Sequence, residues 1–318
     1  MVAILSPNRA PTHAPVLTEE VIRFLSVQPG GRYVDCTLGG GGHATAIMEA
    51  ASPGGLLLGL DADPKALEIA AQRLLSFHDS IRLLEANFRD LAQICRQHNF
   101  VPVHGVLFDL GVSSFQLADL ERGFGFQVEA PLDMRFSPSQ TLTAADIVNR
   151  YPEQTLADLI WRFGEEPASR RIARAIVRAR PLTTTKELAS VIARTAPGQR
   201  HRIHPATRTF QALRIVVNDE LAALAAALDQ ARDVLGQDGR LVVIAFHSLE
   251  DRIVKQFLQR EAKDCICPPE AVRCICGHRA TLRILTKRAV RPTQAEVDAN
   301  PRSRSARLRA AQKLSEGG

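Results

Sequence analysis

Four consecutive glycines, residues 39–42, stand between a short apolar segment and a helix-like one in the stretch YVDCTLGGGGHATAIME. Glycine loses more backbone entropy on folding than any other residue, so such a run indicates a turn from which side chains are excluded. A strand that passes through a glycine turn into a helix is typical of ligand sites in open α/β sheets. The spacing of Gly39, Gly41 and Ala44 also fits the loose dinucleotide pattern G-x-G-x-x-G/A.

Apolar, strand-like segments alternate with helical ones in the first 115 residues and again after residue 216. This alternation predicts an α/β fold with parallel strands covered on both faces, with strands expected at 31–38, 54–63, 81–91, 103–114, 240–248 and 281–290. The stretch between them is irregular and then helical. We expect one discontinuous domain, residues 1–115 plus 217–318, with a mainly helical domain inserted at 116–216. The polar, basic tail 300–318 is expected to be a mobile arm with some helix.

Positive charge is concentrated in the expected insert. Residues 161–217 contain twelve Arg or Lys and three Asp or Glu, whereas the whole chain carries +6, so the remainder is net negative. A basic stripe confined to one region indicates a polyanionic partner such as nucleic acid. The alternative is a solvated helical surface. The arginines that bear on this choice are Arg170, Arg171, Arg174, Arg178 and Arg180.

Acidic residues follow the first two expected strands. Asp61 ends the second strand, where a carboxylate can accept both hydroxyls of an adenosine ribose. NAD and S-adenosylmethionine both carry that ribose. Asp35, directly before the loop, favours the cationic methyl donor, and the absence of a lysine after the glycines argues against a phosphate-binding P-loop. Asp61 could instead cap the helix that Pro64 opens.

Further candidates lie at later strand ends. Phe88 could contact an adenine or belong to the core. Asp109 ends the fourth strand and could accept an N–H of an exocyclic amine, or cap the following loop. His247 could bind substrate or shuttle a proton, or be a buried, hydrogen-bonded histidine. Ser248 and Asp251 have the spacing of a helix-capping box.

The six cysteines favour a reduced, cytoplasmic protein over a disulfide framework. Four of them form a C-x-C-x6-C-x-C pattern, Cys265, Cys267, Cys274 and Cys276. Zinc ligands are more often two or more residues apart, and a C-x-C pair in an extended strand points its side chains apart. A reduced hairpin and a zinc site both remain open, and we expect no metal. We also expect no secretion signal and no membrane span, since no apolar run approaches ~18 residues.

Taken together, these motifs resemble the MraW/RsmH family of bacterial 16S ribosomal RNA cytosine-N4 methyltransferases. The resemblance covers nearly the whole chain and is carried by ordered pieces that include DCTLGGGGH at 35–43, LDADP at 60–64, FDLGVSSFQL at 108–117, GEEPASRRIARAIV at 164–177, TFQALRIVVNDEL at 209–221 and FHSLEDRIVK at 246–255. Nine such pieces in one order are far more specific than any single motif.

The resemblance implies a class I (Rossmann-like) S-adenosylmethionine-dependent methyltransferase with an inserted helical, RNA-recognising domain. The implied acceptor is the N4 amine of a cytidine in the decoding (P-site) region of 16S ribosomal RNA, within the small ribosomal subunit, which would tune decoding. It implies donor contacts from Gly41, Gly42, His43, Asp61, Phe88, Asp109 and Gln116, with Asp109 and His247 as catalytic candidates. The alternatives are a non-catalytic RNA-binding assembly factor and an NAD-linked oxidoreductase. Monomer and homodimer are both open.

Overall fold

A computed structural model describes residues 15–195, 204–268, 270–271 and 273–315; the start of the chain and Arg200 and Arg202 of the basic segment lie outside these ranges. The described chain forms a seven-stranded sheet in the order β3-β2-β1-β4-β5-β7-β6. The first five strands are parallel, and β7 runs antiparallel to both of its neighbours. The strands are β1 (Arg32–Asp35), β2 (Leu56–Asp61), β3 (Ile81–Glu85), β4 (Val103–Asp109), β5 (Leu235–Ala245), β6 (Leu282–Ile284) and β7 (Arg307–Lys313).

Helices cover both faces of this sheet, as the apolar character of its parallel strands requires. Successive side chains of a strand point to opposite faces, so Val34 of β1 joins one core while Tyr33 joins the other. One core is completed by α4 (Leu91–Gln97), α11 (Glu220–Val234) and α12 (Ser248–Glu261). The other is completed by α1 (Thr18–Leu25), α2 (Gly42–Ala51) and α3 (Pro64–Arg73). The α/β fold class expected from the sequence is confirmed.

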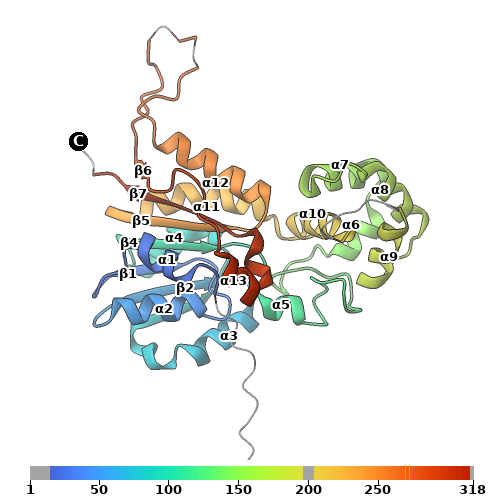
Figure 1. The fold of residues 1–318 in the computed structure, drawn as a ribbon, viewed down its shortest axis with the longest axis horizontal. Helices are drawn as coiled ribbons and strands as arrows, with labels where there is room; N and C mark the ends of the chain where they lie inside the picture. The colour runs from blue at the N-terminus through green and yellow to red at the C-terminus, as the bar shows by residue number, and fades with distance from the viewer. Residues whose placement is uncertain (1–14, 196–203, 269, 272, 316–318) are drawn as a thin grey trace, which may run out of the picture.

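A group of helices between β4 and β5 has a third hydrophobic core and lies to one side of the sheet (Figure 1). After the short α5 (Ser114–Ala118), these are α6 (Ala144–Arg150), α7 (Glu153–Gly164), α8 (Ser169–Arg178), α9 (Thr185–Thr195) and α10 (Ala206–Asn218). Residue Asp219, with φ of 49°, turns the chain directly from α10 into α11. On its other side, the helical group is joined to β4 by the longer segment 110–143, which contains α5 and is otherwise irregular.

The C-terminal segment differs from the expectation of a mobile arm. After α13 (Gln294–Ala299) and a 3₁₀ turn (Pro301–Ser305), residues 307–313 form β7, which lies between β5 and β6. The expected last strand at 281–290 shrinks to the three residues of β6. The basic residues of this segment argued against a strand, but Arg307 and Arg309 form ion pairs with Asp251 of α12, at 3.2 and 2.7 Å. Ala310 and Ala311 are fully buried.

An arm of residues 263–280 projects from the body between α12 and β6 (Figure 1). It contains all four clustered cysteines and carries no helix or strand among its described residues. Within the described ranges, no helix combines the length and the apolar character that a bilayer crossing requires.

Candidate active site

The glycine turn lies at the carboxyl edge of the sheet, between β1 and α2. Its backbone is tied to the neighbouring strand, because Leu38 N donates to Leu60 O at 2.9 Å and Gly39 N donates to Asp61 Oδ2 at 2.7 Å. Gly39 and Gly41 have φ of 51° and 76°, in the left-handed region that favours glycine. The glycines therefore fix a sharp turn against the end of β2.

Close packing on α3 gives a second reason for glycine. It differs from the ligand site that the glycine run led us to expect. A Cβ on Gly41 would lie 3.3 Å from Ala70 of α3, and one on Gly42 would lie 3.1 Å from Cγ of Pro15. In both cases the missing side chain would point at protein atoms and not at a ligand site. A Cβ at Gly40 would make an ordinary 3.6 Å contact with Ile69. At Gly41 and Gly42 the protein's own packing thus disfavours a Cβ, whether or not a donor is bound.

Substitution of Gly41 is consequently expected to destabilise the fold. A Gly41→Val protein places a β-branched residue at positive φ and against Ala70, and the left-handed backbone alone costs about 1–2 kcal/mol. We expect a melting temperature several degrees below wild type, together with weakened donor binding. Gly40→Ala is the matched control, and it should melt with the wild type. Equal melting temperatures for Gly41→Val and Gly40→Ala would contradict this assignment.

Asp61 links the turn to the end of β2. Its Oδ1 accepts from Asp63 N at 2.9 Å, while its Oδ2 accepts from Gly39 N. Burial raises the pKa of this carboxyl to about 6, although the backbone N–H donors lower it. Asp61 itself does not cap α3; Asp63 takes that role by accepting from Lys65 N. The backbone N–H groups of Gly39, Ala62 and Asp63 thus face a carboxylate with about four acceptor sites, which leaves capacity for a further hydrogen bond.

Three titratable side chains meet at the ends of β1 and β4. His43 Nε2 lies 3.4 Å from Asp109 Oδ2, and Asp35 is close enough to affect both. Burial raises the pKa of Asp35 to about 7, against the lowering effect of His43. Burial lowers the pKa of His43 and is the largest single effect, but the carboxylates of Asp109, Asp35 and Glu296 together raise it, so the net shift is upward. These side chains form a buried polar cluster directly beside the glycine turn.

Several atoms of this cluster have hydrogen-bonding capacity to spare. Among the described residues, both ring nitrogens of His43 and Oδ1 of Asp109 are buried and lack a hydrogen-bond partner. A buried polar group without a partner costs roughly 1–3 kcal/mol, so such groups together indicate a ligand that completes them. The other expected role of Asp109, as a side-chain cap, is taken by Ser113, which accepts from Gln116 N.

Phe88 begins the 3₁₀ turn Phe88–Asp90 after β3 and is half-buried. Its ring packs edge-on against Phe108 of β4, with centroids 5.6 Å apart and planes at 87°. Phe88 therefore belongs to the edge of the core and, being partly exposed, still offers an apolar surface at the end of β3.

Gln116 is buried, and its amide is already engaged. Its Nε2 donates to Asp63 Oδ2 at 2.9 Å, and its Oε1 accepts from Ser113 N. Asp63 also pairs with Arg122, whose guanidinium reaches the carbonyls of Arg135 and Phe136. The amide thus belongs to a network that joins the end of β2 to the loop leading into the helical group. Sequence reasoning did not find Arg122, because its partner Asp63 lies 59 residues earlier in the chain.

His247 caps a helix and pairs with Glu250. It is the N-cap of α12, where its side chain accepts from Glu250 N and its Nε2 lies 3.1 Å from Glu250 Oε1. Burial raises the pKa of Glu250, but His247 and Arg214 lower it, and the net shift is downward. The expected capping box of Ser248 and Asp251 is wrong by one residue: Ser248 Oγ instead donates to Glu165, the C-cap of α7.

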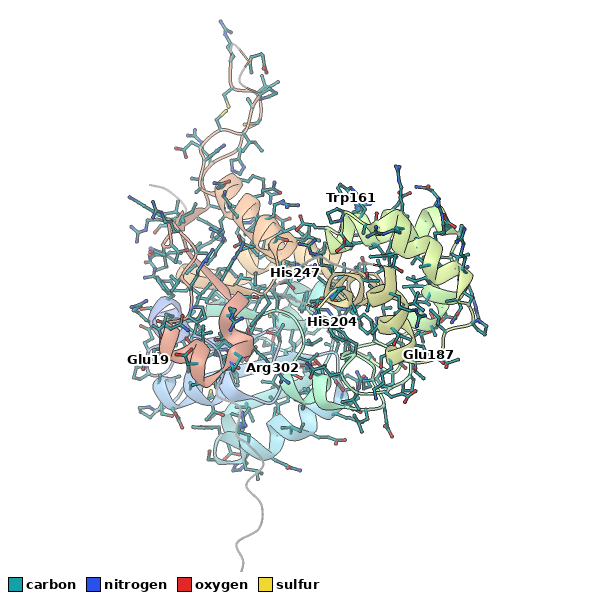
Figure 2. The ribbon with its side chains drawn as sticks, turned by 45° about the vertical axis from the view of Figure 1, so that its right-hand side comes forward. Glu19, Trp161, Glu187, His204, His247 and Arg302 are labelled. Atoms are coloured by element: carbon teal, nitrogen blue, oxygen red, sulfur yellow. The ribbon has the colours of Figure 1, made fainter. Side chains whose placement is uncertain are left out.

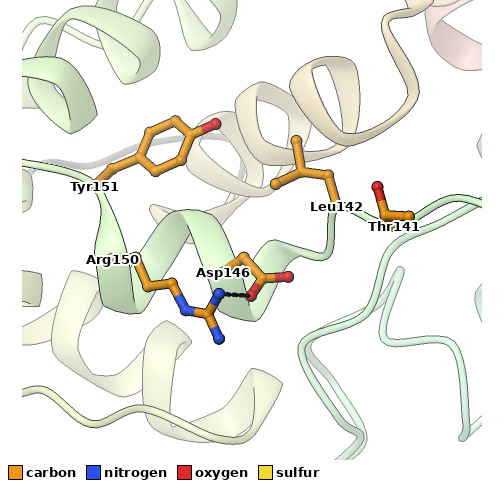
Figure 3. A pocket seen from close by; sticks show the side chains of 5 residues that line it. All are labelled: Thr141, Leu142, Asp146, Arg150 and Tyr151. Atoms are coloured by element: carbon orange, nitrogen blue, oxygen red, sulfur yellow. Dashed lines mark ion pairs between the residues drawn. The ribbon is translucent and has the colours of Figure 1, made fainter.

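Two hollows open elsewhere on the molecule. One, of about 290 Å³, lies beside α6 and is lined by Thr141, Leu142, Asp146, Arg150 and Tyr151, with an Arg150–Asp146 ion pair of 3.2 Å across it (Figure 3). A larger one of about 470 Å³ is lined by one acid, one alanine and six basic residues: Asp251, Lys255, Lys287, Arg288, Ala289, Arg291, Arg307 and Arg309. Neither contains a residue of the glycine turn. The larger hollow lies outside the basic segment that the sequence singled out.

The arginines of that segment divide into two kinds. Arg170, Arg171, Arg174 and Arg178 are exposed on α8, whose opposite side is buried, and Arg174 pairs with Glu153 of α7 at 3.3 Å. Arg180 instead donates to the carbonyls of Val148 and Tyr151 at 2.7 and 2.6 Å, so its role is structural. The neighbouring α7 presents Trp161 at 59% exposure, which sequence reasoning did not single out (Figure 2).

Known proteins of one kind match nearly the whole chain. The sequence profile described as the MraW methylase family matches residues 10–314. A ribosomal RNA small subunit methyltransferase H from Dehalococcoides mccartyi is 59% identical over 96% of this chain and 88% of its own length. Proteins of the same name from Thermomicrobium roseum and Syntrophobacter fumaroxidans are 57% and 51% identical, over 96% and 97% of this chain and 95% and 98% of theirs.

Proposed function

The chain belongs to the MraW methylase family and is a methyltransferase that uses S-adenosylmethionine on small-subunit ribosomal RNA, and we propose that its acceptor is the exocyclic N4 amine of a cytidine in the decoding region. Family membership over residues 10–314 favours this activity over an NAD-linked oxidoreductase and over a non-catalytic assembly factor. The sequence resemblance to this family is confirmed by the profile and by the relatives.

The donor fits the carboxyl edge of the sheet. S-adenosylmethionine, when bound, supplies a methyl group activated by its sulfonium. We propose that Asp61 accepts hydrogen bonds from its ribose and that Phe88 offers its ring to the adenine. The main chain at Gly41 and Gly42, with His43 behind it, would border the methionine part. Gln116 would act through the network that it forms with Asp63 and Arg122.

The unpartnered carboxylate oxygen of Asp109 is the observation that carries the choice of an amine acceptor. The lone pair of an exocyclic base amine is delocalised into the ring, which makes the nitrogen a poor nucleophile. Asp109 Oδ1 could accept one N–H and so favour the geometry in which the lone pair is free. As the N–C bond forms, the bond between methyl and sulfonium sulfur would break to leave S-adenosylhomocysteine, and the amine proton would pass to Asp109, whose Oδ2 lies 3.4 Å from His43 Nε2. His247, which caps α12, remains a candidate for holding the substrate.

RNA recognition is proposed for the helical group, taken as a domain of residues 116–216 inserted into a methyltransferase domain of 1–115 plus 217–318. Exposed Arg170, Arg171 and Arg178 offer phosphate contacts, and exposed Trp161 offers a ring on which an unpaired base could stack. The basic hollow beside α12 would add phosphate contacts on the sheet side. The cellular partner would be the small ribosomal subunit in the cytoplasm.

Transfer of labelled methyl groups tests the acceptor directly. The purified chain, S-adenosylmethionine with an isotopic methyl group, and small subunits from cells lacking the enzyme should yield labelled N4-methylcytidine at one position by mass mapping. Free ribosomal RNA is the parallel substrate that shows whether assembly is needed. Label on the 5-carbon of cytidine, or on another base, would contradict the proposed amine acceptor while leaving the methyltransferase assignment intact.

Removing positive charge from α8 should weaken RNA binding alone. An Arg170→Gln/Arg171→Gln protein is expected to lose about two phosphate contacts, each worth ~0.7–0.9 in the slope of log affinity against log salt. Its donor affinity, measured by calorimetry, should equal wild type. Arg23→Gln/Arg96→Gln removes the same charge from exposed positions on α1 and α4 and is the matched control. Equal loss of RNA affinity in both variants would show only a net-charge effect.

A further inference from the structure

The four cysteines of the projecting arm lie together, two from each of its limbs. Their sulfur atoms all fall within 4.8 Å of one another, although Cys267 and Cys274 are separated by six residues. The sulfur–sulfur distances are 4.0 Å for Cys267–Cys274, 3.6 Å for Cys274–Cys276 and 3.8 Å for Cys276–Cys265. The sequence expectation of a metal-free hairpin did not anticipate this convergence.

These distances match a tetrahedral tetrathiolate. A zinc ion bound by four sulfurs at ~2.3 Å holds the sulfurs about 3.8 Å apart at tetrahedral angles. A disulfide would require a sulfur–sulfur separation of about 2.05 Å. Burial does not explain the cluster either, because Cys265, Cys274 and Cys276 are exposed and the described residues of the arm belong to none of the three hydrophobic cores. A bound ion is therefore the cause that fits both the separation and the exposure.

In an extended strand the two thiols of a C-x-C pair would point apart, but the backbone around these cysteines is bent. The chain bends at Cys267 and at Cys276, so each pair can turn both thiols to one side. The two halves are also reciprocal: Ile266 N donates to Cys276 Sγ at 3.4 Å, and Ile275 N donates to Cys267 Sγ at 3.3 Å. Such N–H donors orient and partly neutralise sulfur ligands of a metal.

From this geometry we propose that Cys265, Cys267, Cys274 and Cys276 bind one zinc ion as a structural site that joins the two limbs of the arm. All four ligand positions are filled by protein, which is the pattern of structural zinc and leaves no open position for catalysis. The arm lies away from the glycine turn, so the ion would order the arm without taking part in methyl transfer (Figure 1). The exposed side chains of Ile266 and Ile275 would then be held outward in fixed positions.

Metal analysis of the full chain, purified without chelator, tests this site. We expect about one zinc per chain, and loss of it in Cys265→Ser and Cys276→Ser. Ile275→Ser is the matched control, because it changes an 85%-exposed residue within the same segment but keeps all four thiols. Donor affinity by calorimetry should be unchanged in all three variants, which shows that the body of the protein still folds. Cobalt added to the metal-free chain should give the visible bands of tetrahedral thiolate coordination.

Three results would overturn the proposal. The first is a metal-free chain whose four arm thiols all react with a thiol reagent in the presence of added zinc. The second is iron in place of zinc. The third is a mass lower by about four hydrogens, which shows two disulfides. None of these outcomes bears on the methyltransferase reaction, so the zinc proposal and the acceptor proposal can fail separately.

Discussion

An Asp109→Asn protein is expected to bind the donor and to transfer methyl groups about 10²–10⁴-fold more slowly than wild type, the usual range for losing a positioned proton acceptor. The substitution keeps the size of the side chain at the end of β4. It removes the charge beside His43, and an amide group can no longer take a proton from the acceptor amine. Single-turnover transfer to small subunits measures the chemical step, and calorimetry with S-adenosylhomocysteine measures binding.

Asp90→Asn is the matched control, since it makes the same change at an exposed carboxylate that follows β3. It should transfer methyl groups at the wild-type rate. A wild-type single-turnover rate in Asp109→Asn would remove the proposed role of this carboxylate. Equal loss of rate and of donor affinity would instead assign Asp109 to donor binding.

The positions of several site residues at the carboxyl edge of the sheet can be predicted from the sequence, because the end of a strand is a local feature. An apolar segment ending in Asp61 or Asp109 predicts a carboxylate at the carboxyl edge of a parallel sheet, wherever the strands later pair. The structure places both there, on β2 and β4. The glycine run likewise predicts a turn between β1 and α2. These predictions need only the hydrophobic pattern and the turn chemistry of a few adjacent residues.

What the sequence could not provide depends on distant contacts. The segment that forms β7 is basic and polar, and its arginines are neutralised only by a distant residue. Asp251, which binds Arg307 and Arg309, lies more than fifty residues earlier. The packing reason for Gly41 depends on Ala70, and the role of Arg180 depends on carbonyls of Val148 and Tyr151. The capping box of α12 was displaced by one residue because a histidine takes the N-cap, and serine is the more usual choice.

The free energy of unfolding of the ligand-free protein should depend on pH because of its buried carboxyl groups. Burial raises the pKa of Asp61 to about 6 and of Asp35 to about 7, above the ordinary value of 3.8. Between about pH 4 and pH 7 the folded state therefore binds protons that the unfolded state has lost, so these groups make the free energy of unfolding fall as pH rises. The raised pKa of His43 acts in the same direction above its ordinary value of 6.5.

Donor binding should depend on pH with the opposite sign, and Asp61 gives the second large expected effect. An ionised carboxylate accepts ribose hydroxyls, and a hydrogen bond to a charged group contributes about 1.5–3 kcal/mol. We therefore expect the affinity for S-adenosylhomocysteine to rise through about pH 6, and Asp61→Asn to raise its Kd about 10- to 100-fold at pH 8 and to flatten that rise. Calorimetry from pH 5 to 8 measures both.

The Asn side chain also disturbs the turn, because Gly39 N and Asp63 N both donate to Asp61 and only one of these bonds has an acceptor in an amide. A melting curve of each variant separates loss of the turn from loss of the ribose contact, and exposed Asp79→Asn is the control for removing one negative charge. A Kd for Asp61→Asn within twofold of wild type at pH 8, with the melting temperature preserved, would show that the ribose lies elsewhere. A rise in Kd at pH 8 that shrinks towards pH 5, where the wild-type carboxyl is itself protonated, is the result that places the ribose on Asp61, because loss of the turn alone would weaken binding at every pH.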